Sequence, residues 1–147
     1  LALVMDMWPG RAVGWSMSDR MGAGLADEAP RMAIARRRPP AGCTRHSGHG
    51  SRYVSLRLGR TMRDNGIRPS MGAISSPWDN AAMESPMGLV KAECVHARTF
   101  ESRERAALEI FEYMERLYDR VRTHSALGHL SPEEFEARNR KGAAVAA

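Results

Sequence analysis

Residues 78–85 read W-D-N-A-A-M-E-S and carry the strongest structural signal in this chain, and Lys91 follows them. The Asp-Asn pair is typical of a helix start, which places Glu84 in the early turns of a helix predicted over residues 80–95. Lys91 lies two helical turns, about 10 Å, beyond Glu84 on the same face. Spacing alone favours a solvated amphipathic helix over a divalent-metal ligand beside a DNA-phosphate contact.

Four further stretches of the sequence have equally distinctive residue patterns. They are residues 3–18, L-V-M-D-M-W-P-G-R-A-V-G-W-S-M-S; residues 46–53, H-S-G-H-G-S-R-Y; residues 64–71, D-N-G-I-R-P-S-M; and residues 118–135, Y-D-R-V-R-T-H-S-A-L-G-H-L-S-P-E-E-F. Taken in this order with residues 78–85, they resemble the motifs of bacterial insertion-sequence transposases with a retroviral-integrase-like core. The resemblance implies an RNase H-like α/β fold and a catalytic triad of Asp, Asp and Glu.

The resemblance implies that Glu84 is the third carboxylate of the triad. Gly48 stands where the family has its second Asp, and the 35 residues between Gly48 and Glu84 match the family's spacing. The first Asp belongs to a central strand upstream of the hairpin, whereas the printed sequence starts at Leu1, within the hairpin's first strand; Asp6 matches a non-catalytic position. We therefore expect an RNase H-like domain without its first strand, in which Glu84 faces Gly48 and is the only carboxylate of the triad.

The family is thought to hold two Mg²⁺ or Mn²⁺ ions between its three carboxylates, and these ions activate the attacking and leaving oxygens. With Glu84 as the single ligand, we expect poor metal binding and no strand transfer. The resemblance also implies that Lys91 contacts DNA near the end of the element. We expect Arg98, Arg120 and Arg122 to meet phosphates as well, although Arg120 and Arg122 also suit a solvated helix end that favours cations.

The composition predicts a globular protein that contacts polyanions. The 147 residues are 43% hydrophobic, enough for a domain with a real core, and the net charge is +5 with 22 Lys and Arg against 17 Asp and Glu. Arginine dominates the basic residues, which suits bidentate phosphate binding but is also typical of a high-GC genome. No apolar run approaches the ~20 residues of a membrane span and no signal peptide is evident, so we expect a cytoplasmic protein with two reduced cysteines.

Two histidines and a cysteine raise the alternative of a zinc site. Cys43, His46 and His49 are spaced three residues apart, but no fourth ligand is evident and the family motif already accounts for His46. We therefore do not predict structural zinc.

The hydrophobic pattern predicts alternating strands and helices. The resemblance implies that residues 1–100 form a partial integrase core and residues 101–141 the C-terminal helical part of the same domain, and we expect a disordered tail over residues 142–147. Strands are expected at residues 1–7, 12–17, 41–47 and 67–71, with 41–47 in the core. A helix over 24–38 carries Pro30 in its middle, where proline costs about 3 kcal/mol if the helix persists. Its inward residues are Leu25, Met32 and Ile34.

Further helices are expected at residues 54–64, with Gly66 as the C-cap, at 80–95 and at 102–122. Pro86 and Gly88 should interrupt the helix over 80–95, and residues 72–79 should form the loop before it. The helix over 102–122 should turn an apolar face inward; its residues are Leu108, Phe111, Met114, Glu115 and Tyr118. Ser131 caps a short final helix with Pro132 in its first position.

Three hypotheses for the function follow. The first is an inactive remnant of a transposase that mediates DNA integration. The second is a non-catalytic module that binds DNA or oligomerises, with itself or with a full-length transposase whose action it blocks. The third is an unrelated small α/β protein.

Overall fold

The computed structural model describes residues 1–18, 23–47, 56–71 and 78–145. They form two compact units: the first comprises Leu1–Val4 and Val13–Gly88, and the second Met5–Ala12 and Leu89–Ala147. Each unit is therefore built from two segments of the chain, and those of the second unit are far apart in the sequence. No helix among the described residues is long and apolar enough to cross a membrane.

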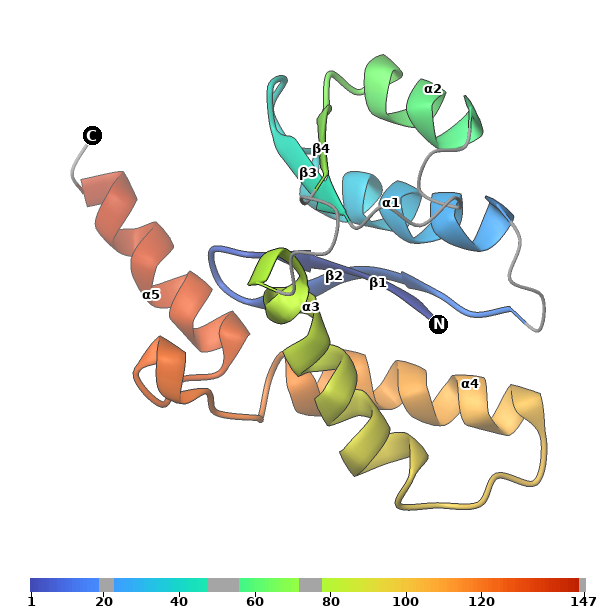
Figure 1. Ribbon diagram of the computed structural model, residues 1–147. Coiled ribbons are helices and arrows are strands. Elements are labelled where there is room, and N and C mark those ends of the chain that lie inside the picture. The colour runs from blue at the N-terminus through green and yellow to red at the C-terminus, as the bar shows by residue number, and fades with distance from the viewer. Residues whose placement is uncertain (19–22, 48–55, 72–77, 146–147) are drawn as a thin grey trace. The chain divides into compact units, whose positions relative to one another are not determined.

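The chain opens with the predicted hairpin, formed by β1 (Ala2–Asp6) and β2 (Arg11–Ser16) (Figure 1). Asp6 lies where β1 ends, and its Oδ1 accepts the Trp8 N–H at 3.3 Å, which assigns it to the turn. Gly10 completes the turn with φ +67°, a conformation that favours glycine. The strands predicted at residues 1–7 and 12–17 are thus confirmed.

Helix α1 (Ala23–Arg37) packs closely on β2 within the first unit. Leu25 and Ala29 form a cluster with Ala2, and Ser16 donates a 2.5 Å hydrogen bond to the Leu25 carbonyl. The helix continues through Pro30, whose side chain is buried. It therefore stays intact despite the cost in stability that a proline within a helix carries.

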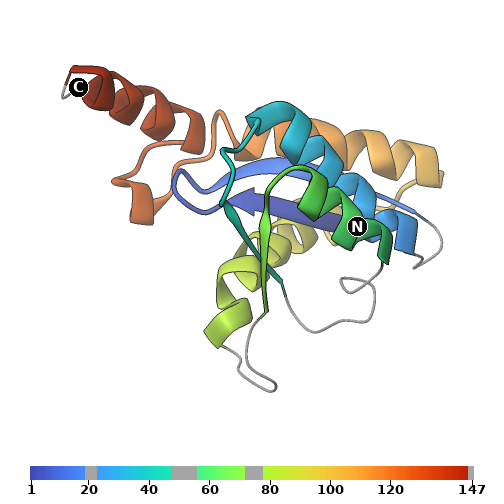
Figure 2. The same ribbon diagram turned by 90° about the horizontal axis from the view of Figure 1, so that it is seen from above.

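Helix α2 (Leu56–Asp64) lies beside α1, as Figures 1 and 2 both show. Leu58, Met62 and Ile67 form a cluster against which Ile34 packs, which confirms that Ile34 faces inward. Asp27 is fully buried between the helices; it accepts the Thr61 hydroxyl at 2.9 Å and pairs with Arg31 and Arg57. Gly66 ends the helix with φ +65°, as predicted.

Strands β3 (Thr44–Ser47) and β4 (Arg68–Met71) pair in parallel, with Thr44 opposite Arg68 (Figure 2). The prediction that residues 41–47 form a core strand is wrong in burial, because Thr44 and His46 are exposed. Among the described strands, β3 pairs only with β4. The described strands make two separate two-stranded sheets, β1–β2 and β3–β4.

Helix α3 (Trp78–Leu89) continues directly into a π-helical turn, η2 (Val90–Val95). The predicted interruption at Pro86 and Gly88 is wrong: the helix passes both, and burial of the Pro86 side chain offsets its missing N–H. The predicted loop over 72–79 lies outside the described residues up to 77, and its last two residues already belong to α3.

Helix α4 (Arg103–Glu112), capped by Ser102, continues into a second π-helical turn, η3 (Tyr113–Tyr118). Met114 and Tyr118 are buried as predicted, but Leu108 and Phe111 are exposed, which corrects the predicted inward face. The buried face instead includes Ile110 and Tyr113. The wide π turn, closed by the Asp119 N–H on the Met114 carbonyl at 3.4 Å, buries Tyr118 and Asp119 together.

The chain ends with a short 3-10 turn, η4 (Ser125–Leu127), and helix α5 (Pro132–Val145). The Ser131 hydroxyl accepts the Glu134 N–H at 3.3 Å, and the Glu134 carboxylate accepts the Ser131 N–H at 3.0 Å. This capping box confirms the predicted helix start. The helix is longer than predicted and includes residues 142–145 of the expected tail.

Gly14 is the tightest point between β2 and α1. A Cβ atom there would lie 2.1 Å from the Ala29 carbonyl oxygen and 2.8 Å from the Ala33 nitrogen. We expect Gly14→Ala to lower the free energy of unfolding by about 3 kcal/mol or more, because backbone must move. Urea unfolding measures the loss.

The matched control is Gly59→Ala. Gly59 lies in α2, and an added Cβ there meets no atom of the described residues within 4 Å. This substitution should stabilise the helix by roughly 0.5–1 kcal/mol. Equal effects of the two substitutions would contradict the close approach at Gly14.

Candidate active site and nucleic-acid interface

Glu84 lies in α3 within the first unit, and its side chain is exposed. No hydrogen bond or ion pair joins its carboxylate to another described residue. Gly48, the residue predicted to face it, lies outside the described residues. The predicted pair therefore stays a prediction.

The described residues do not fit a divalent-metal centre. Nowhere among them do three or more His, Cys, Asp or Glu side chains gather as a metal ion requires, and Glu84 offers one exposed carboxylate. For the zinc alternative, Cys43 and His46 are both exposed, His46 Nδ1 lies 3.1 Å from the Ser70 hydroxyl, and His49 is outside the described part.

The four basic residues predicted to meet DNA differ in their surroundings. Lys91 is exposed at the start of η2, and no described carboxylate pairs with its ammonium group. The three arginines all have acidic partners. Arg98 pairs with Glu109 at 2.5 Å, Arg120 pairs with Glu133 at 3.2 Å, and Arg122 pairs with Glu93. Lys91 is thus the one member of the predicted set whose charge is free within the described chain.

Arg122 is held more deeply than the other two arginines. Its side chain is 30% exposed, against about 60% for Arg98 and Arg120. The Glu93 carboxylate that binds it also accepts the Tyr113 hydroxyl at 2.7 Å. Burial and this carboxylate raise the pKa of Tyr113, so its phenol stays protonated and donates.

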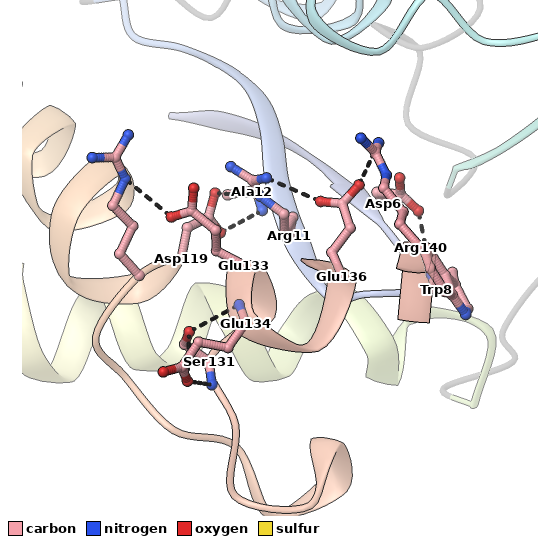
Figure 3. Close-up of polar contacts among 11 residues, drawn as sticks. Asp6, Trp8, Arg11, Ala12, Asp119, Ser131, Glu133, Glu134, Glu136 and Arg140 are labelled. Atoms are coloured by element: carbon pink, nitrogen blue, oxygen red, sulfur yellow. Dashed lines mark hydrogen bonds and ion pairs between the residues drawn. The ribbon is translucent and has the colours of Figure 1, made fainter. Parts of the chain in front are cut away.

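Asp119 organises the second unit from within the C-terminal motif (Figure 3). Its carboxylate is nearly fully buried; it accepts the Ala12 N–H at 3.0 Å and the Arg11 Nε at 3.4 Å. Arg11 also donates to Glu136 at 3.0 Å, and Arg140 pairs with Glu136 at 2.6 Å. Burial raises the pKa of Asp119, and the Ala12 N–H and Arg11 oppose that rise.

The remainder of the motif turns the chain back after η3. The His124 ring packs edge-on against Tyr118 at 5.0 Å between centroids, and His124 bridges to Leu130. Gly128 lies between them with φ +65°. Burial raises the pKa of Tyr118 to about 12 and lowers that of His124, so both rings are neutral near pH 7.

Several of these residues were not predicted from the sequence. Arg11 and Glu136 are adjacent to or inside the motif stretches, but their pairing joins segments 125 positions apart and no local pattern indicates it. Glu93 and Tyr113 lie outside the quoted motifs and carry no sequence signal of their own.

The comparisons with known proteins agree with the fold. A family model described as "Integrase core domain" matches residues 65–132. A chain of the simian T-cell lymphotropic virus intasome, solved by cryo-electron microscopy in complex with PP2A regulatory subunit B56 gamma, superposes with a TM-score of 0.70. It is 12% identical, and the match covers 89% of this chain and 45% of that one. The chain thus has the RNase H-like fold of an integrase core.

Curated relatives are closer in sequence. "Transposase InsF for insertion sequence IS3A" of Escherichia coli (strain K12) is 42% identical over 95% of this chain and 48% of its own length. "Transposase for insertion sequence element IS904" of Lactococcus lactis subsp. lactis (strain IL1403) is 39% identical over 95% of this chain and 55% of its own length. The chain spans about half the length of these relatives and is similar to insertion-sequence transposases with an integrase-like core.

The Asp119 network can be tested by substitution. Asp119→Ala should lower the free energy of unfolding by about 2–4 kcal/mol, because it leaves the Ala12 N–H and the Arg11 guanidinium without their acceptor. Asp119→Asn keeps an oxygen for the Ala12 N–H and should lose less. Chemical denaturation of the three proteins checks the order, and an Asn variant as unstable as the Ala variant would contradict it.

Proposed function

We propose that this chain is the partial integrase core of an insertion-sequence transposase and that its role lies in DNA transposition. The observation that carries the proposal is 42% identity to a transposase over 95% of the chain. The integrase-core match over residues 65–132 and the intasome-like fold support it. The third hypothesis, an unrelated small protein, does not account for these similarities.

The same proposal includes the loss of catalysis by the chain as it stands. Gly48 stands at the second position of the implied triad, so Glu84 lacks that carboxylate as a partner. The family resemblance implies Mg²⁺ or Mn²⁺, which supplies charge stabilisation at the phosphodiester. One exposed carboxylate does not hold such an ion in octahedral geometry.

We expect no metal-dependent cleavage or joining of DNA. The chain is incubated with Mn²⁺ and an oligonucleotide carrying the 3′ end of a related element, and products are resolved on a gel. Glu84→Gln is the matched control. Product that vanishes with Glu84→Gln would overturn the proposal of inactivity. Gly48→Asp alone should not restore product, because the three carboxylates of the implied triad act together and this substitution supplies only the second.

DNA contact is the activity that remains, and Lys91 is its centre. Lys91 is exposed with no described carboxylate beside it. Arg98 and Arg120 can contact DNA only after their ion pairs with Glu109 and Glu133 break. Both arginine side chains are exposed, so these ion pairs are weak. A chain that keeps this contact without catalysis also fits the second hypothesis, in which it assembles with itself or with a full-length transposase in the cytoplasm and blocks it.

Lys91→Glu should weaken DNA binding. We expect a Kd on the order of 10⁻⁴–10⁻⁶ M for the unaltered chain at physiological salt, without sequence preference. The substitution should flatten the slope of log Kd against log salt by about one contact. Fluorescence anisotropy across a salt series measures both, with Arg120→Glu as a control on a paired cation. Affinity that ignores salt, or that Lys91→Glu leaves unchanged, would mean that the basic residues only solubilise the chain.

A further inference from the structure

Glu93, two residues after Lys91, links the η2 turn to a later part of the chain. The Glu93 carboxylate points to α4–η3 and its following segment, where the Tyr113 hydroxyl donates to Oε2 at 2.7 Å and Arg122 pairs with Oε1. Val90 and Cys94 of the same turn are buried, whereas Lys91 is exposed. One side of η2 is therefore held inside the second unit while Lys91 faces outward.

Both contacting segments are π-helical. The Lys91 carbonyl accepts the His96 N–H at 2.7 Å and so closes the wide turn of η2, and Tyr113 opens η3. A π turn contains more residues than an α turn and so changes the direction in which each side chain points. Such turns are rare and are frequently found at functional sites. The direction of Lys91 thus depends on contacts that keep η2 in this form.

Arg122 already holds η2 through its ion pair with Glu93. Its side chain is 30% exposed, and its Nε is buried without an acceptor among the described residues. Arg98 also pairs with Glu109 of α4, but the Arg98 side chain is 59% exposed, and an ion pair of so exposed an arginine contributes little. Arg122 is therefore the stronger clamp and the poorer candidate for a phosphate contact.

We propose that Glu93, Tyr113 and Arg122 are positioning residues: they fix the η2 turn so that Lys91 meets a DNA phosphate, and Arg122 itself does not touch DNA. This inference rests on the proposed DNA contact of Lys91. It replaces the expectation that Lys91 and Arg122 bind phosphates independently.

The first measurement is the salt dependence of DNA binding. Lys91→Gln should lower the slope of log Kd against log salt by about 0.9, the value of one phosphate contact. Arg122→Gln should produce a similar loss, and the double variant should lose no more than either single one, because Arg122 acts through Lys91. Tyr113→Phe alters no charge, so a lower slope in this variant reports positioning. A double variant that loses two contacts, or a Tyr113→Phe slope equal to that of the unaltered chain, would overturn the proposal.

The second measurement needs no DNA. Cys94 lies buried beside Glu93 in η2, and the other cysteine, Cys43, is exposed. In a Cys43→Ser background, a thiol reagent therefore reports opening of the turn. Tyr113→Phe and Glu93→Gln should speed modification of Cys94 by about fivefold or more, since each weakens a hydrogen bond that holds the turn. Lys91→Gln should leave the rate unchanged.

The two measurements separate the possible failures. A chain that does not bind DNA would overturn the proposed function, while faster Cys94 modification would still identify the clamp. Unchanged Cys94 rates in Tyr113→Phe and Glu93→Gln would overturn the positioning role even if Lys91 binds DNA. Should Arg122→Gln fail to fold, the two milder variants still decide the matter.

Discussion

The second unit depends on one buried carboxylate. Asp119 accepts the backbone N–H of Ala12 and the Arg11 side chain, and so joins the hairpin to a helix end 107 positions later in the chain. A buried N–H without an acceptor is costly, and so is a buried carboxylate without a donor, so each group requires the other. The contacts of Arg11 with Glu136, and of the Asp119 carbonyl with the Glu133 N–H at 3.0 Å, extend the same constraint to α5.

The sequence was most informative where local chemistry determines the backbone. The hairpin, the Gly66 cap, the Ser131–Glu134 capping box and the order of strands and helices all follow from turn residues and periodicity, and the structure confirms them. The integrase-like fold was predicted from the resemblance of the sequence motifs to a known family, and not from hydrophobic periodicity or turn residues. Of the predicted site, Glu84 and Lys91 are exposed and unpaired among described residues, whereas the three arginines are paired.

The remaining features depend on tertiary contacts that no local pattern encodes. Burial offsets the missing hydrogen bonds of Pro30 and Pro86, so both helices continue where propensity predicts a break. The helix predicted over residues 102–122 changes from α4 to the π turn η3, and Leu108, which was predicted to face inward, is exposed. Arg122 carries the same charge as Arg120 and is likewise paired with a glutamate, yet its side chain is 30% exposed whereas that of Arg120 is 60% exposed.

The discontinuous second unit has a consequence for how the chain matures on the ribosome. Residues 5–12 emerge early, but Asp119 and Glu136, their acceptor and ion-pair partner, are made more than a hundred codons later. The first unit, whose last residue is Gly88, can form before those partners exist. Contacts of such long range are slow to close and leave intermediates exposed to association. Premature termination near the C-terminus would therefore damage the amino-terminal hairpin as much as the final helix.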